Sequence, residues 1–239
     1  MFFKRAVLII HGLGGGTYDI EYLANYLQTV RSFYVYTFTL PGHDRILQSK
    51  IKKEDWLLSV DEQVEILVKK GYKKIYVIGH SMGGVLASYV AANHKEVKKL
   101  VLAAPAFIHI LSEENSGGAF KKVPSIIRGY GIGETISRLF KMAPVNFIEF
   151  TSLVKKYKDV PTEIKIPTII IQGQADELVP EASAFYVYNK LQSRTKKLIL
   201  YKTANHDLFR SNDNKKIAKA IIKFLRYTPY LRKTIKKEN

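Results

Sequence analysis

The stretch Gly79-His80-Ser81-Met82-Gly83-Gly84 decides the fold of this 239-residue chain. It follows an apolar run at residues 75–78, which predicts a buried strand, and it precedes the apolar helical pattern of residues 85–92. The pattern G-x-S-x-G between a strand and a helix is typical of a nucleophile elbow, a turn that strains the serine backbone and raises its Oγ above the sheet edge. Side chains at Gly79 and Gly83 would collide with neighbouring backbone, and the helix N-terminus supplies partial positive charge. The alternative is a glycine-rich turn with an inert serine.

Short apolar runs alternate with amphipathic stretches on both sides of this motif. Further strands are predicted at residues 6–10, 34–38, 100–103, 168–171 and 198–201. Further helices are predicted at residues 19–28, 56–68, 182–191 and 215–226. Strands that alternate with helices indicate right-handed βαβ units, and continuous apolar strands are typical of a parallel sheet covered on both faces. The sequence therefore predicts an α/β fold with a mostly parallel sheet flanked by helices.

The middle of the chain breaks this alternation. Residues 108–165 contain no clear strand, and several glycines interrupt short apolar helical pieces there. Pro161 and Pro167 precede the return to strand pattern. We therefore expect a core formed by residues 1–107 and 166–239, with a helical cap, or lid, inserted at residues 108–165.

A second glycine-rich segment, His11-Gly12-Leu13-Gly14-Gly15-Gly16, directly follows the first predicted strand. A phosphate-binding loop is disfavoured, because no Walker lysine and no acidic residue after a following strand accompany it. The segment is better interpreted as an oxyanion loop, since acyl transfer builds negative charge that two preorganised N–H groups must meet. We expect one donor to be the backbone N–H of Met82, directly after the serine, and the other that of Leu13.

An acid and a base are predicted on later loops. Asp176 is the first acidic residue after the strand at 168–171, at the same sheet edge as the elbow, and Glu177 is its nearest rival. The chain has six histidines, but only His206 follows both the serine and the acid on a loop past a late strand. The order Ser, Asp, His is the one that this kind of elbow uses. A solvent-exposed turn aspartate and a structural histidine are the alternatives.

Composition excludes several classes of protein. With 46% apolar and 25% charged residues, the chain can bury a core, and its composition is that of a globular protein rather than a disordered one. There is no cysteine, which excludes disulfides and thiolate chemistry. Metal-ligand spacings are absent, so we expect neither a metal nor a cofactor. Without a signal-peptide core or a run of about 20 apolar residues, we expect a cytoplasmic protein with no membrane span.

The formal net charge of +17 admits two interpretations. An anionic partner, such as nucleic acid or a lipid surface, would explain it. A lysine-rich solvated surface explains it equally simply, and it is preferred because the lysines are scattered. Only residues 232–237 form a compact basic block. We therefore expect no nucleic-acid partner and at most weak contact with anionic surfaces.

At these residues the chain resembles the small bacterial carboxylesterases and monoacylglycerol lipases of the α/β-hydrolase superfamily. The segments that carry the resemblance are His11-Gly12-Leu13, Pro41-Gly42-His43, Asp55-Trp56, residues 79–84, Pro167, residues 172–180 and Asn205-His206. The resemblance implies an α/β-hydrolase fold with six or seven strands. It also implies a catalytic triad of Ser81, Asp176 and His206, with Leu13 and Met82 as the oxyanion donors.

We therefore expect a serine hydrolase that cleaves carboxylic esters through an acyl-enzyme. The insertion holds many apolar residues. Some of them must form the core of the cap, and the surplus suggests an apolar acyl pocket and short- to medium-chain esters or monoacylglycerols as substrates. These residues are Ile110, Leu111, Phe120, Ile126, Ile127, Tyr130, Leu139, Phe140, Phe147, Ile148 and Phe150. Another Ser-His-Asp hydrolase, such as a thioesterase, a C–C bond hydrolase or an aminopeptidase, is the first alternative. The second is a non-catalytic binding protein with a basic surface.

Overall fold

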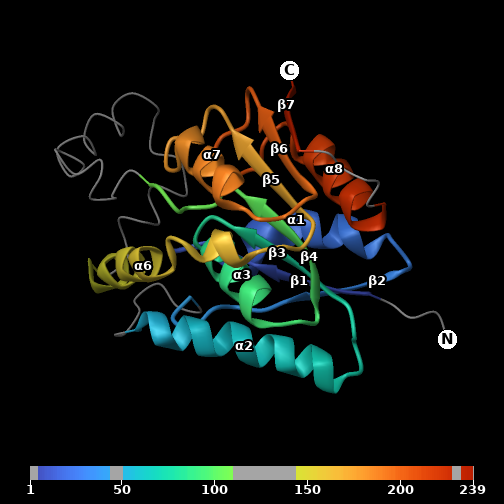
Figure 1. Cartoon of the computed structure of the whole chain (residues 1–239), viewed down its shortest axis with the longest axis vertical. Helices are drawn as coiled ribbons and strands as arrows, with labels where there is room; N and C mark the ends of the chain where they lie inside the picture. Colours follow the sequence, from blue (N-terminus) through green and yellow to red (C-terminus); the bar gives the residue numbers. More distant parts are fainter. Residues whose placement is uncertain (1–4, 44–50, 110–143, 228–232, 239) are drawn as a thin grey trace.

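The fold is built on one seven-stranded sheet in which every neighbouring pair of strands is parallel. The computed structural model describes residues 5–43, 51–109, 144–227 and 233–238. The sheet order is β2-β1-β3-β4-β5-β6-β7 (Figure 1). The strands are β1 (Arg5–Ile10), β2 (Phe33–Thr37), β3 (Ile75–His80), β4 (Val97–Ala103), β5 (Thr168–Gly173), β6 (Lys196–Tyr201) and β7 (Thr234–Glu238).

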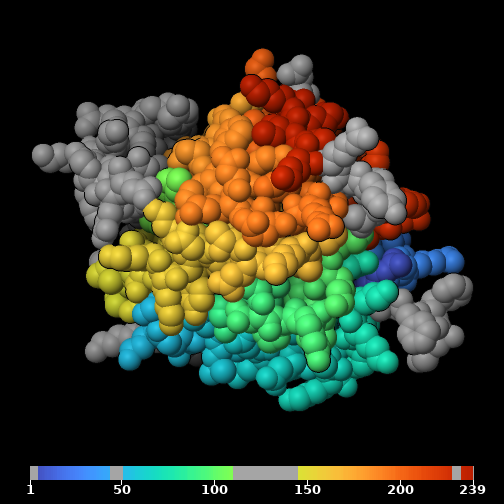
Figure 2. Space-filling model, viewed as in Figure 1, coloured from blue at the N-terminus to red at the C-terminus, as the bar shows by residue number. Residues whose placement is uncertain are grey.

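Helices cover both faces of the sheet. One face carries α1 (Thr17–Gln28) and α8 (Asn214–Arg226), whose apolar side chains share one buried cluster. The other face carries α2 (Lys53–Lys69), α3 (Met82–Asn93), α6 (Pro144–Tyr157) and α7 (Glu181–Lys190), which share a second buried cluster. Figure 2 shows this second face, where the segments coloured from cyan to orange lie at the surface.

The strands divide their side chains between these two clusters. In β1, Leu8 and Ile10 belong to the cluster under α2 and α3, whereas Val7 and Ile9 belong to the cluster under α1 and α8. Alternate residues of a strand point to opposite faces, and both faces are covered, so the whole strand from residue 6 onward is apolar and buried. This explains why continuous apolar runs, rather than alternating ones, predicted the strands.

The order of the strands fixes where a site can form. The chain passes from β1 outward to β2 and then returns to β3 on the opposite side of β1. In an open parallel sheet, such a reversal leaves a crevice outside the carboxyl ends of the two strands on either side of it. The loops that follow β1 and β3 therefore meet there, and these loops contain the two glycine-rich segments of the sequence.

The predicted α/β fold with a parallel sheet is confirmed, with two local corrections. Helix α3 begins at Met82, directly after the serine, and not at residue 85. No strand was predicted in the basic block at residues 232–237, but Thr234–Glu238 forms strand β7 beside β6. This strand was missed because it has no buried apolar run: Ile235 is half exposed, and residues 234–237 are all exposed. Backbone pairing, which has no sequence signature of its own, defines it.

Most of the predicted cap, residues 110–143, lies outside the described residues. The described part of the 108–165 segment contains α6 and the short 3₁₀ helix η2 (Val160–Glu163). Phe150 and Leu153 of α6 are buried in the cluster that they share with α2 and α3. These residues belong to the packing of the domain itself, and the division into core and cap stays a prediction.

Candidate active site

Ser81 occupies the tight turn between β3 and α3. Its φ of 56° lies in the left-handed region that residues other than glycine rarely adopt. The Ser81 N–H donates to Ala103 O at 2.9 Å, and the Ser81 carbonyl accepts from Gly84 N at 2.8 Å. Backbone strain of this kind persists only where the surroundings enforce it. The turn presents the Ser81 side chain, which is 9% exposed, to a pocket at the sheet edge.

Two glycines make this turn possible. A Cβ on Gly79 would lie 2.1 Å from the carbonyl oxygen of Gly83, and a Cβ on Gly83 would lie 2.3 Å from the carbonyl oxygen of Ile10. Both neighbours are backbone atoms, which cannot rotate away as a side chain could. The collisions predicted from the sequence are therefore present, and the start of α3 packs directly on the end of β1.

His206 and Asp176 form a buried pair beside this turn. The Nδ1 of His206 lies 2.9 Å from Asp176 Oδ2 and 3.0 Å from Oδ1. Asp176 Oδ1 also accepts the backbone N–H groups of Leu178 at 2.9 Å and Val179 at 2.8 Å. Both side chains are almost completely buried. Because Nδ1 faces a carboxylate, it carries the proton, and Nε2 is left as the acceptor.

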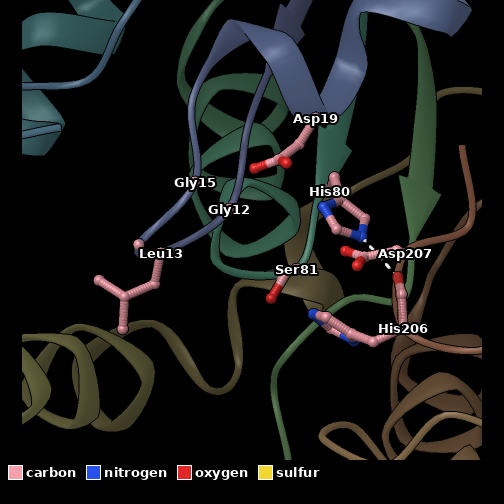
Figure 3. A pocket seen from close by; sticks show the side chains of 9 residues that line it. Gly12, Leu13, Gly15, Asp19, His80, Ser81, His206 and Asp207 are labelled. Atoms are coloured by element: carbon pink, nitrogen blue, oxygen red, sulfur yellow. Dashed lines mark hydrogen bonds between the residues drawn. The ribbon is translucent and has the colours of Figure 1, made fainter. Parts of the chain in front are cut away.

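Ser81 and His206 line the same pocket. Figure 3 shows the side chain of Ser81 beside the ring of His206, with a ring nitrogen on the side of the ring nearer to Ser81. The serine comes from the β3–α3 turn and the histidine from the loop after β6, so residues 125 positions apart in the sequence meet at one sheet edge. The ring of His206 thus contacts a buried carboxylate through Nδ1 and shares a pocket with the hydroxyl of Ser81. Such an arrangement can move a proton from the hydroxyl.

His206 and Asp176 each shift the pKa of the other in the direction that favours its charged form. Burial by itself would lower the pKa of His206, but the Asp176 carboxylate raises that pKa above its usual value. Burial would likewise raise the pKa of Asp176, but His206 and the backbone donors hold it below the usual value. Asp176 therefore stays ionised, and His206 is a stronger base than a free histidine.

Glu177, the rival acid, is placed differently. Its Oε2 accepts the backbone N–H of His206 at 3.4 Å, whereas the ring of His206 contacts Asp176. Burial raises the pKa of Glu177. Glu177 therefore supports the backbone of the histidine loop, and Asp176 is the acid beside the ring.

The segment after β1 lies alongside Ser81. Gly12, Leu13, Gly14 and Gly15 line the pocket, and a Cβ on Gly12 would lie only 3.0 Å from Ser81 Cβ. Met82 is the first residue of α3, so its N–H has no acceptor within the helix. The N–H groups predicted as oxyanion donors thus belong to the loop beside the serine and to the helix N-terminus behind it.

His11 holds the loop in place. Its Nδ1 donates to Gly12 O at 2.8 Å, and its Nε2 accepts the N–H of Leu40 at 3.0 Å. Burial, together with the nearby His43, lowers the pKa of His11 to about 3, so the ring stays neutral and keeps both bonds. The carbonyl of Gly12 and the N–H of Leu13 belong to one rigid peptide unit, so this contact also fixes the direction of the Leu13 N–H.

His80 has a structural contact that the sequence did not reveal. Its Nε2 lies 2.9 Å from the carbonyl oxygen of His206, to which it donates (Figure 3). The two rings are 5.0 Å apart. Burial lowers the pKa of His80, so it is a neutral donor that ties the histidine loop to the elbow. Its position within G-x-S-x-G was the only signal in the sequence.

The described ranges contain neither a candidate metal site nor a candidate membrane span. No group of three or more histidine or acidic side chains there is arranged to hold a metal ion. None of the helices in those ranges is both long and apolar enough to cross a membrane.

Comparison with known families identifies the class of the protein. A family model described as alpha/beta hydrolase fold matches residues 5–130, which is more than half of the chain. The chain therefore belongs to the α/β-hydrolase fold family. A second model, described as serine aminopeptidase, S33, matches residues 137–213.

Individual relatives are ester hydrolases by name. The chain is 27% identical over 233 residues to a carboxylesterase from Bacillus subtilis (strain 168), and the alignment covers 92% of each chain. It is 24% identical over 211 residues to a thermostable monoacylglycerol lipase from Bacillus sp. (strain H-257), covering 84% of this chain and 82% of the relative. A solved structure from a study of two metagenome-derived lipolytic enzymes, LipS and LipT, has a TM-score of 0.74 at 20% identity and covers 93% of this chain and 94% of its own.

The packing of the elbow predicts a graded effect of glycine substitutions. Gly83→Ala should lower the free energy of unfolding by about 2–4 kcal/mol, because the new Cβ meets backbone that cannot move aside. Gly84→Ala is the matched control, since its Cβ would approach Pro105 no closer than 3.1 Å. Its change should stay below about 1 kcal/mol, because a gain in helix propensity offsets the tight contact. Equal decreases in the free energy of unfolding of the two variants, measured by urea denaturation, would contradict this packing.

The buried pair predicts the titration of His206. NMR of the histidine rings should show His206 titrating above the usual histidine value, and Asp176→Asn should move its pKa below that value, because burial then acts alone. Glu177→Gln is the control and should lower the pKa less. A His206 that titrates identically in wild type and Asp176→Asn would show that the carboxylate does not act on the ring.

Proposed function

We propose that this protein is a serine hydrolase of carboxylic esters, with Ser81 as nucleophile, His206 as general base and Asp176 as the acid that orients the histidine. One observation carries the proposal: Nδ1 of His206 contacts the buried Asp176 carboxylate, and the ring of His206 shares a pocket with the Ser81 hydroxyl on the strained turn. The names of the relatives, carboxylesterase and monoacylglycerol lipase, support the same class of substrate.

The first half of the reaction forms an acyl-enzyme. His206 Nε2 accepts the proton of the Ser81 hydroxyl as Ser81 Oγ attacks the ester carbonyl carbon. The carbonyl oxygen gains negative charge and accepts hydrogen bonds from the N–H groups of Leu13 and Met82. As the tetrahedral intermediate collapses, the ester C–O bond breaks, and the protonated His206 gives its proton to the leaving alcohol.

The second half regenerates the enzyme. His206 accepts a proton from water, the resulting hydroxide attacks the acyl carbon, and Ser81 leaves with the proton that His206 returns. Asp176 keeps its negative charge throughout, holds Nδ1 protonated and stabilises the imidazolium in both halves. The raised pKa of His206 makes the ring a better base. Activity should fall when the pH drops below that pKa, because the ring is then already protonated and cannot accept the serine proton.

Short- to medium-chain acyl esters or monoacylglycerols are the proposed substrates. Of the apolar residues assigned to an acyl pocket, only Phe147, Ile148 and Phe150 are among the described residues. Phe150 is buried in the core and Phe147 packs against it, while Ile148 is 67% exposed. The burial of Phe150 favours a role in the core, and not in an acyl pocket, for that residue. The substrate class therefore rests mainly on the relatives. A cytoplasmic location stays a prediction.

A second candidate function is an aminopeptidase. The match of residues 137–213 to the serine aminopeptidase model favours it. The same Ser81, His206 and Asp176 would serve, because amide and ester cleavage share the tetrahedral intermediate. Aminoacyl p-nitroanilides distinguish the two candidates, since turnover of these amides with no turnover of simple esters would favour the aminopeptidase.

Replacement of the nucleophile should abolish activity. Ser81→Ala should lower kcat by about 10⁴- to 10⁶-fold toward p-nitrophenyl butyrate, because no covalent intermediate can form. It should also abolish labelling by a fluorophosphonate probe. Ser88→Ala, which removes another buried hydroxyl on α3, is the control and should keep both. Labelling that persists in Ser81→Ala would reject the assignment of the nucleophile.

A series of p-nitrophenyl esters from acetate to palmitate tests the substrate class. The value of kcat/KM should rise to a maximum among the short and medium acyl chains, because each buried methylene adds apolar contact until the acyl pocket is full. The wild-type enzyme is compared with Ser81→Ala to subtract spontaneous hydrolysis. A flat profile, or no turnover at any chain length, would remove this substrate class.

A further inference from the structure

Gln172 is a buried polar residue for which the mechanism above gives no role. It is the second-last residue of β5 and lies on the same face of the strand as Thr168 and Ile170. Its side chain is fully buried, next to the loop that carries Asp176. Polar side chains buried this completely are uncommon unless hydrogen bonds compensate them.

The amide nitrogen of Gln172 contacts the acid directly. Nε2 donates to Asp176 Oδ2 at 3.0 Å and to the carbonyl oxygen of Val179 at 3.0 Å, and it lies 3.2 Å from Gly173 O. Asp176 Oδ2 is also the oxygen nearest to His206 Nδ1. The Gln172 amide therefore holds one carboxylate oxygen, while backbone N–H groups of the loop hold the other.

The orientation of the amide has a cost. Within the described part of the chain, Gln172 Oε1 is buried without a hydrogen-bond partner. Rotating the amide by half a turn would place Oε1 against three acceptor oxygens, so the nitrogen must face Asp176. A buried acceptor without a partner is unfavourable. The amide accepts this cost while its nitrogen faces Asp176 and Val179 O.

We propose that Gln172 is a positioning residue, which acts through Asp176 by fixing the carboxylate in the plane that His206 Nδ1 meets. This inference rests on the proposed function. A glutamine suits the task because it donates a hydrogen bond without adding charge. A lysine or arginine there would oppose the negative charge with which Asp176 raises the pKa of His206. The titratable groups around Asp176 are His206 and Glu177.

Two variants separate positioning from packing. Gln172→Met keeps most of the volume and removes the donor, so kcat for p-nitrophenyl butyrate should fall by about 10- to 100-fold while KM changes by less than about threefold. Thr168→Val is the matched control, because it removes a buried hydroxyl from the same face of β5. That hydroxyl donates a hydrogen bond to Ile166 O, away from Asp176. This variant should keep wild-type kcat.

The variant Gln172→Glu tests the pH dependence of kcat, which a purely structural role of Gln172 would leave unchanged. A protonated Glu at this position can donate to Asp176, whereas an ionised Glu repels it. The activity of Gln172→Glu relative to wild type should therefore fall as pH rises, which adds an ionisation to the pH profile of kcat. Wild type and Thr168→Val should lack it. Rates are normalised to folded protein, measured by gel filtration and circular dichroism.

Each outcome is decisive. Wild-type kcat in Gln172→Met together with an unchanged pH profile in Gln172→Glu would overturn the positioning role. Failure of both variants to fold would assign Gln172 to the stability of the loop and overturn it as well. If Ser81→Ala stays active, the proposed function fails. If Ser81 is essential and the Gln172 variants behave as wild type, only the present inference fails.

Discussion

The left-handed backbone of Ser81 is the constraint on which the site depends. A φ of 56° turns the chain from β3 into α3 within one residue, which projects the hydroxyl beyond the sheet edge and places the helix N-terminus behind it. This geometry needs bare backbone at Gly79 and Gly83, where a Cβ would meet carbonyl oxygens at 2.1 Å and 2.3 Å. Since one of those oxygens belongs to Ile10 of β1, the elbow and the loop after β1 are positioned together.

Buried neutral groups position the charged pair. His206 and Asp176 are both almost completely buried, and each stabilises the charged form of the other. Around them, His80 holds the backbone of His206, and His11 holds the loop that carries Leu13. Neutral donors fix direction without adding charge beside the carboxylate and the imidazole. A site preorganised in this way loses little energy to rearrangement during the reaction.

Sequence patterns predicted the elements whose signal is local. Apolar runs such as residues 6–10 predicted the strands, and the glycines of the elbow predicted a turn that the structure contains. The order of serine, acid and histidine placed all three on loops at one sheet edge. Strand β7 was missed because its residues are exposed and only backbone pairing defines it. The contacts of His80 and Gln172 could not be predicted, because they join residues that meet only in the folded chain.

A crystal structure of the protein after reaction with a fluorophosphonate would test most directly whether Ser81 is the nucleophile, because the bound phosphorus has the tetrahedral geometry of the intermediate. Phosphorus should be bonded to Ser81 Oγ, with the phosphoryl oxygen within about 3 Å of both the Leu13 and the Met82 backbone nitrogens. His206 Nε2 should lie within hydrogen-bond distance of Ser81 Oγ. Phosphorus on another residue, or a phosphoryl oxygen that faces away from both nitrogens, would contradict it.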